Sequence, residues 1–234
     1  MNLETDRLKN GNKLMEAVIE PKKLKDSQEY YVLALLKKIF PEEYKNLLKK
    51  NIDRPDLKDV SDNFGVEVTT ADSEYDNEDN RLLSIYRKNK KKEIKKVLEK
   101  HGNIICNTGM TTRIISGAGY NTKYDNHLLT QSICKKIISV KKYSLNFKYV
   151  DLVVIKNEIV PSIWEDEIFN CVDEIVKHNE MVFRNIFIIY RNHCYCTFSN
   201  GNHKKIYIEK KDRLRVLGRL TAEGVIKMED EEWN

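Results

Sequence analysis

Apolar residues recur at helical spacing in two long stretches of this chain. The first covers residues 26–40, whose apolar positions share one face until Pro41 ends or kinks the helix. The second covers about residues 125–142, where Ile133 and Ile137 lie one turn apart on the same face. Shorter segments predict three more helices, at residues 42–50, 80–100 and 161–178.

Alternating and continuous apolar runs predict the strands of a central sheet. Residues 55–60 and 64–70 are β-prone, and the turn-forming trio between them predicts a hairpin. Residues 149–155 are apolar except for Asp151, which is typical of a strand covered on both faces. The other predicted strands lie in residues 103–119 (strand, turn, strand), 185–190, 193–198 and 206–208, the last two forming a C-terminal β-hairpin. This order predicts an α/β fold, a central mixed sheet flanked by helices, with an inserted basic helix.

The chain has 234 residues, of which 41% are hydrophobic and 33% charged, as expected for a globular protein. No apolar run approaches the roughly 18 residues that a membrane span needs. Because the start of the chain also lacks the apolar region of a signal peptide, we expect a cytoplasmic protein without membrane contact. We expect an N-terminal arm over residues 1–25 and one α/β domain over residues 26–234, with an insertion at about residues 75–122.

Charge is distributed unevenly, although the net charge is only +5. Residues 66–80 contain six acids and no base, whereas residues 81–100 contain nine bases and two acids. Such separation could place a cation-binding site beside a surface that attracts phosphates. The alternative for the basic segment is a solvated helix face. The lysines expected to bind nucleic acid are Lys88, Lys91, Lys92 and Lys95.

Three acids are candidates for residues of an active site. The predicted hairpin brings Asp56, which directly follows Pro55, close to Glu67, although the two acids are eleven positions apart. Glu29 lies on the apolar stripe of the first helix, where a carboxylate needs an explanation. Either it completes a capping box with Asp26 as N-cap, or it faces an active site.

Several common catalytic and metal-binding motifs are absent from the sequence. It contains no G-x-S-x-G elbow, Walker A loop or G-x-G-x-x-G fingerprint, which disfavours serine hydrolases and nucleotide-driven enzymes. The pair Cys194 and Cys196 has no second pair at zinc-ligand spacing, which disfavours a zinc site.

The order of elements, combined with Pro55-Asp56 and Glu67-Val68-Thr69, resembles the PD-(D/E)xK nuclease superfamily, which has the restriction-endonuclease-like fold. The resemblance covers about residues 26–190 and implies that Asp56 and Glu67 bind one or two Mg²⁺ (or Mn²⁺) ions. It also implies that the acid of the preceding helix, here Glu29, contributes to the site.

The sequence departs from this family at the motif lysine, where it has Thr69. Threonine cannot replace the positive charge, but some members are similar in carrying the lysine on the next core helix. Lys136, three residues after the core-facing Ile133, is the first candidate for this role, and Lys135 and Lys142 are alternatives. Each of them could instead be a solvated lysine.

The expected function is therefore a metal-dependent endonuclease that acts on DNA rather than RNA, in restriction or phage defence. Asp56 and Glu67 would be the metal ligands, Glu29 would orient a water or a second ion, and Lys136 would stabilise the phosphate. The alternative is a nuclease-like fold that has lost catalysis and binds nucleic acid or a partner protein. A second copy of the chain or a partner protein of a defence system could complete the assembly.

Overall fold

The computed structural model describes residues 21–49, 54–61, 63–71, 104–107, 112–115, 122–143, 147–156, 167–179 and 182–227. Contacts divide the chain into two compact units, one of residues 1–20 and 72–125 and the other of residues 21–71 and 126–234. The first unit contains the antiparallel strands β4 (Ile104–Asn107) and β5 (Thr112–Ile115), which agree with the predicted strand, turn and strand. The predicted basic helix at residues 80–100 lies outside the described residues.

The second unit is built on a seven-stranded mixed sheet with the order β1-β2-β3-β6-β7-β8-β9. Strands β3, β6 and β7 are parallel, and the outer strands pair with them and with one another in antiparallel fashion. The strand bounds are β1 Leu47–Leu48, β2 Leu57–Asp59, β3 Phe64–Thr70, β6 Tyr149–Lys156, β7 Asn185–Tyr190, β8 His193–Phe198 and β9 His203–Tyr207. The predicted hairpin is confirmed as β2 and β3, and the predicted C-terminal hairpin as β8 and β9.

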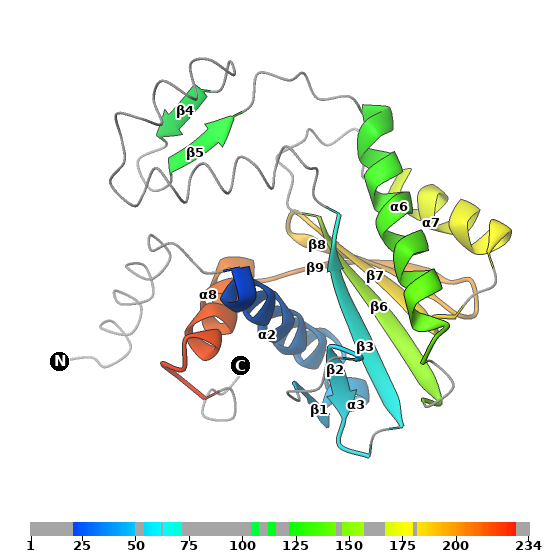
Figure 1. Cartoon of the computed structure of the whole chain (residues 1–234), viewed down its shortest axis with the longest axis horizontal. Helices are drawn as coiled ribbons and strands as arrows, with labels where there is room; N and C mark the ends of the chain where they lie inside the picture. The colour runs from blue at the N-terminus through cyan, green and yellow to red at the C-terminus, as the bar shows by residue number, and fades with distance from the viewer. Residues whose placement is uncertain are drawn as a thin grey trace. The chain divides into compact units, whose positions relative to one another are not determined.

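Helices cover both faces of this sheet (Figure 1). Helices α2 (Pro21–Ile39) and α8 (Lys211–Ala222) enclose the first core, whereas α6 (Thr122–Val140) and α7 (Glu167–His178) enclose the second. The α/β class with a mixed sheet between helices is thus confirmed. Within the described residues, no helix has the length and apolarity needed to cross a membrane.

The alternation of β3 decides which side chains can reach a site. Val66 and Val68 are buried in the first core, against α2. The intervening Glu67 lies on the opposite face, toward α6, and its Cα is paired with that of Leu152 in β6. Because successive side chains of a strand point to opposite faces, the apolar residues that anchor β3 also fix the direction of Glu67.

Two local predictions need correction, and one helix was missed. Helix α2 begins at Pro21, a favoured first-turn residue, so Asp26 lies inside the helix and is not its N-cap. The predicted helix at residues 42–50 is only the single turn of α3 (Pro41–Tyr44), after which β1 pairs with β2. Helix α8 was not predicted at all. Its Gly218 packs on α2, where a Cβ would lie 2.7 Å from the carbonyl oxygen of Ser27.

Candidate active site

Asp56 is held against β3 immediately before β2 begins. Its Oδ2 accepts a hydrogen bond of 2.8 Å from the backbone N–H of Val68. The side chains of Asp56 and Glu67 are both buried, so neither carboxylate is freely hydrated. A buried carboxylate needs a compensating partner, because its charge has lost the stabilisation of bulk water.

Gly65 permits this arrangement. A Cβ at position 65 would lie 2.1 Å from Cγ of Pro55, which is closer than atoms can approach. The missing side chain therefore lets Pro55 pack directly on β3. Because Asp56 follows Pro55, this close approach sets where the Asp56 carboxylate lies.

Lys136 of α6 provides a positive charge to both acids. Its Nζ forms an ion pair with Oε2 of Glu67 and lies 3.7 Å from Oδ2 of Asp56. The fully buried Ile133 fixes the helix one turn earlier. The alternatives Lys135 and Lys142 are exposed, and Thr69 is half-buried on β3. Among the predicted lysines, Lys136 is thus the one that the structure places at the acid pair.

Tyr143, in the turn after α6, was not predicted as a site residue. Its hydroxyl donates a hydrogen bond to Oε1 of Glu67. Burial raises the pKa of Tyr143, and the neighbouring Glu67 carboxylate raises it further, so the hydroxyl remains a neutral donor. Both oxygens of Glu67 therefore have a donor, one from Tyr143 and one from Lys136.

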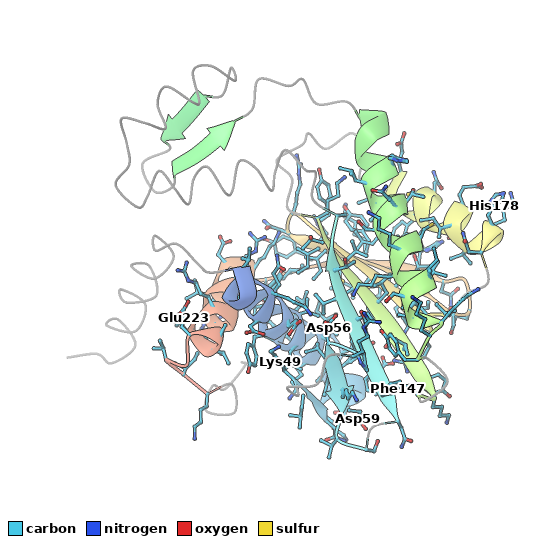
Figure 2. All side chains as sticks on the ribbon, in the orientation of Figure 1. Lys49, Asp56, Asp59, Phe147, His178 and Glu223 are labelled. Carbon is cyan, nitrogen blue, oxygen red and sulfur yellow. The ribbon has the colours of Figure 1, made fainter. Side chains whose placement is uncertain are left out.

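Glu29 joins the same cluster through Lys25. The Lys25 ammonium lies 3.3 Å from Oε1 of Glu29 and 3.1 Å from Oδ1 of Asp56. On its other side Glu29 forms an ion pair with Lys49, which lies 2.8 Å from Oδ1 of Asp26. Lys49 and Asp56, two members of this series of contacts, are labelled in Figure 2. Glu29 and Asp56 thus share Lys25 as a partner, and the capping explanation of Glu29 is wrong because Asp26 lies inside α2.

The pKa directions in this cluster follow from burial and charge. Burial alone would lower the pKa of Lys25 and of Lys49, but the facing carboxylates more than offset this and raise both values. Burial also raises the pKa of Glu29, and repulsion from Asp56 adds to it, against the opposing effect of Lys49. The two lysines thus remain charged at neutral pH.

Asp56 and Glu67 are the two acids of the cluster that could together hold a small divalent cation. Asp56 and Glu67 both approach the ammonium of Lys136, so their oxygens already converge on one positive charge. Mg²⁺ retains several waters and needs only one or two protein carboxylates. Within the described part of the chain, no three His, Cys, Asp or Glu side chains form a group that could hold a metal ion. An ion here would therefore depend on these two acids together with water or backbone oxygens.

A second charged cluster, around Asp151 of β6, has a different character. Asp151 is completely buried and accepts hydrogen bonds from the Tyr44 hydroxyl at 2.7 Å, from Arg184 Nε at 3.1 Å and from the Asn185 N–H at 3.0 Å. A carboxylate saturated with donors and closed to solvent ties α3 to β6 and β7. We therefore assign Asp151 a structural role.

The predicted nucleic-acid-binding lysines, Lys88, Lys91, Lys92 and Lys95, lie outside the described residues. The chain matches no known protein family, no curated protein and no solved structure. The inference of function therefore depends on the geometry and chemistry of the cluster formed by Glu29, Asp56, Glu67 and Lys136.

Proposed function

We propose that this protein is a metal-dependent endonuclease that hydrolyses phosphodiester bonds of DNA. The observation that carries the proposal is the approach of Lys136 to both Asp56 and Glu67, two buried acids in the strand context of the PD-(D/E)xK motif. Lysine is absent from the expected strand position, and a lysine from α6 supplies the charge instead. Two acids and one lysine are the residue types that metal-assisted phosphodiester hydrolysis needs.

Each residue would have a separate role. A Mg²⁺ or Mn²⁺ ion bound by Asp56 and Glu67 would neutralise the phosphate and lower the pKa of a bound water. Lys136 would stabilise the negative charge that grows on the phosphate toward the transition state. Glu29, whose pKa is raised by burial, would orient the attacking water. Tyr143 would keep the Glu67 carboxylate in one orientation through its hydrogen bond.

The biological context that we propose is restriction or phage defence. Nucleases that resemble this arrangement occur in such systems, and many of them pair to cut both strands. DNA is the preferred substrate in this proposal, and a second copy of the chain or a partner protein would complete the assembly.

Cleavage of plasmid DNA in the presence of Mg²⁺ tests the proposal. Glu67→Gln and Asp56→Asn should each reduce nicking by roughly 10²-fold or more, because each removes a charged ligand from the site. Glu42→Gln is the matched control, since Glu42 is a glutamate whose side chain is 92% exposed. Nicking that is equal in wild type and Glu67→Gln would remove the assigned role.

A second candidate function is a non-catalytic module that binds nucleic acid or a partner protein. The observation that favours it is that Lys25, Lys49 and Lys136 already neutralise the buried acids, so the cluster needs no metal to be stable. Calorimetric titration with Mn²⁺ distinguishes the two functions. A nuclease should bind the ion through Asp56 and Glu67, whereas a non-catalytic module should show no carboxylate-dependent binding.

A further inference from the structure

Two cations flank Asp56 in the sequence and differ from the lysines of the acid cluster. Arg54 precedes it by two residues and Lys58 follows it by two. Within the part of the chain that the structure describes, neither has a carboxylate partner, and each lies over an aromatic ring instead. Among the described residues, therefore, no acid neutralises either charge, in contrast to Lys25 and Lys136.

The two aromatic rings form a continuous path away from Glu67. Tyr143 donates its hydroxyl to Glu67, and the Arg54 guanidinium lies 5.9 Å from the centre of the Tyr143 ring. The Phe147 ring packs edge-on against Tyr143 with centroids 6.5 Å apart, and the Lys58 ammonium lies 5.1 Å from the Phe147 centroid. Phe147 is labelled in Figure 2. We call Arg54, Lys58, Tyr143 and Phe147 the cation–aromatic path.

The path lies on the same face of the sheet as Glu67. Leu57 of β2 is buried in the first core, so the next residue, Lys58, points to the opposite face. Phe147 packs against the second core, on the side of α6. Arg54 is exposed and Lys58 is half-buried, so both charges can reach a ligand in solvent.

We propose that Arg54 and Lys58 bind two phosphates of the nucleic-acid strand that is cleaved at Asp56 and Glu67. This inference rests on the proposed function, and it adds the direction in which the strand leaves the acid pair, along Tyr143 and Phe147 beyond the end of α6. A guanidinium can grip a phosphate with two parallel hydrogen bonds, and a lysine acts on it as a point charge. The rings beneath hold each cation in place through cation–π attraction.

The expected ligand is an anion, because both cations lie over aromatic rings and the described part of the chain offers them no acid. Each phosphate that a protein cation contacts releases condensed counterions from the nucleic acid, which makes the affinity depend on salt. An acidic segment of a partner protein would also be attracted to two cations, but it would lack this defined salt dependence. The salt dependence therefore separates a nucleic acid from an acidic protein.

The test measures binding of the full chain to labelled single-stranded DNA, duplex DNA and RNA in EDTA, across a series of salt concentrations. The double variant Arg54→Gln/Lys58→Gln should lower the slope of log affinity against log salt by about 1.8 on duplex DNA. Because one such contact contributes about eightfold at about 0.1 M salt, affinity there should fall about 60-fold. Arg54→Lys/Lys58→Arg, which keeps both charges, should retain the wild-type slope.

Lys148→Gln is the matched control. Lys148 also lies over an aromatic ring, 5.0 Å from the centre of Tyr149. That ring is on the other face of the sheet, because Arg184 contacts both Tyr149 and Phe64, and Phe64 packs against the first core. Its removal should leave the slope of log affinity against log salt within a few tenths of the wild-type value. A loss in Lys148→Gln equal to that in the double variant would mean that nonspecific surface charge is measured, and it would overturn the proposal.

The outcomes separate this inference from the proposed function. If Arg54→Gln/Lys58→Gln binds as wild type does, the cation–aromatic path is wrong, whether or not the protein cleaves DNA. If the double variant loses binding as expected but wild type cleaves nothing with Mg²⁺, the phosphate site stands and the nuclease proposal fails. If wild type binds neither DNA nor RNA, both are overturned.

Discussion

Lys136 of α6 forms an ion pair with Glu67 of β3, although 69 positions separate the two residues in the chain. The contact joins the helix of the second core to the strand that carries the motif acid. It also places an ammonium where Thr69 of the strand cannot provide one. The lysine thus has two functions in our account, which are to neutralise buried acids and to stabilise a phosphate.

Replacing Lys136 by Met should affect both stability and activity. Glu67 would remain buried without a cation, which should lower the free energy of unfolding by about 1–3 kcal/mol. DNA cleavage should fall by roughly 10²-fold, as when one stabilising donor is lost. Lys136→Arg is the control, because it retains the charge and should recover most of the stability. Urea denaturation of the three proteins measures the first effect, and a Lys136→Met variant as stable as wild type would contradict it.

Lys25→Gln should increase the affinity for divalent cations. The Lys25 ammonium lies 3.1 Å from Oδ1 of Asp56, the oxygen that the Val68 N–H leaves free, so a bound ion would have to displace it. Because the Lys25 side chain is 62% exposed, the gain should be only about two- to fivefold. Mn²⁺ calorimetry measures it, with the equally exposed Lys45→Gln as control. Weaker binding in Lys25→Gln would show that this lysine supports the ion instead of competing with it.

Gly65→Ala should distort the position of Asp56. The added Cβ would lie 2.1 Å from Pro55 Cγ, so the chain before β2 would have to move away from β3. Overpacking of this kind should lower the free energy of unfolding by about 1–3 kcal/mol. Mn²⁺ affinity should fall together with stability, because Asp56 moves with Pro55. Unchanged thermal and Mn²⁺-binding curves would show that Pro55 adapts without displacing the acid.

Lys211, at the start of α8, should titrate unusually. Burial, together with the charge of Arg215, lowers its pKa to about 8. Between about pH 8 and 10.5 the unfolded chain would still hold a proton that the folded protein has lost, so stability should rise with pH across this window. The cost of burying the charged ammonium is thus full below about pH 8 and absent above about pH 10.5. Denaturation of wild type and Lys211→Met should therefore show that the stability of wild type relative to the variant rises as the pH increases from about 8 to 10.5. Parallel pH profiles of the two proteins would contradict the shift.

The sequence was sufficient for elements with a clear period. Strand β3 was correctly placed because Val66 and Val68 alternate with polar neighbours, and α6 because Ile133 and Ile137 repeat at helical spacing. A shorter offset of three residues, which also keeps two side chains on neighbouring faces of a helix, led from Ile133 to Lys136. Elements whose identity depends on packing were missed. Helix α8 contains Gly218, which disfavours a helix in isolation but permits close contact with α2.

Most of the cluster around the acids was beyond sequence reasoning, because its contacts join distant elements. Tyr143 and Glu67 are 76 positions apart in the sequence, and Lys49 and Glu29 are 20 apart. No periodic pattern in the sequence predicts either contact. Lys25 is different. It precedes Glu29 by four residues on one helix, a spacing that predicts an ion pair, so this partner could have been found.

Titration with Mn²⁺ tests the central claim most directly, because every assigned role depends on a cation held by Asp56 and Glu67. The account predicts carboxylate-dependent binding to wild type, which the double variant Asp56→Asn/Glu67→Gln abolishes while it remains folded by circular dichroism. Wild type that binds no Mn²⁺, or a folded double variant that binds it as tightly as wild type, would contradict the account.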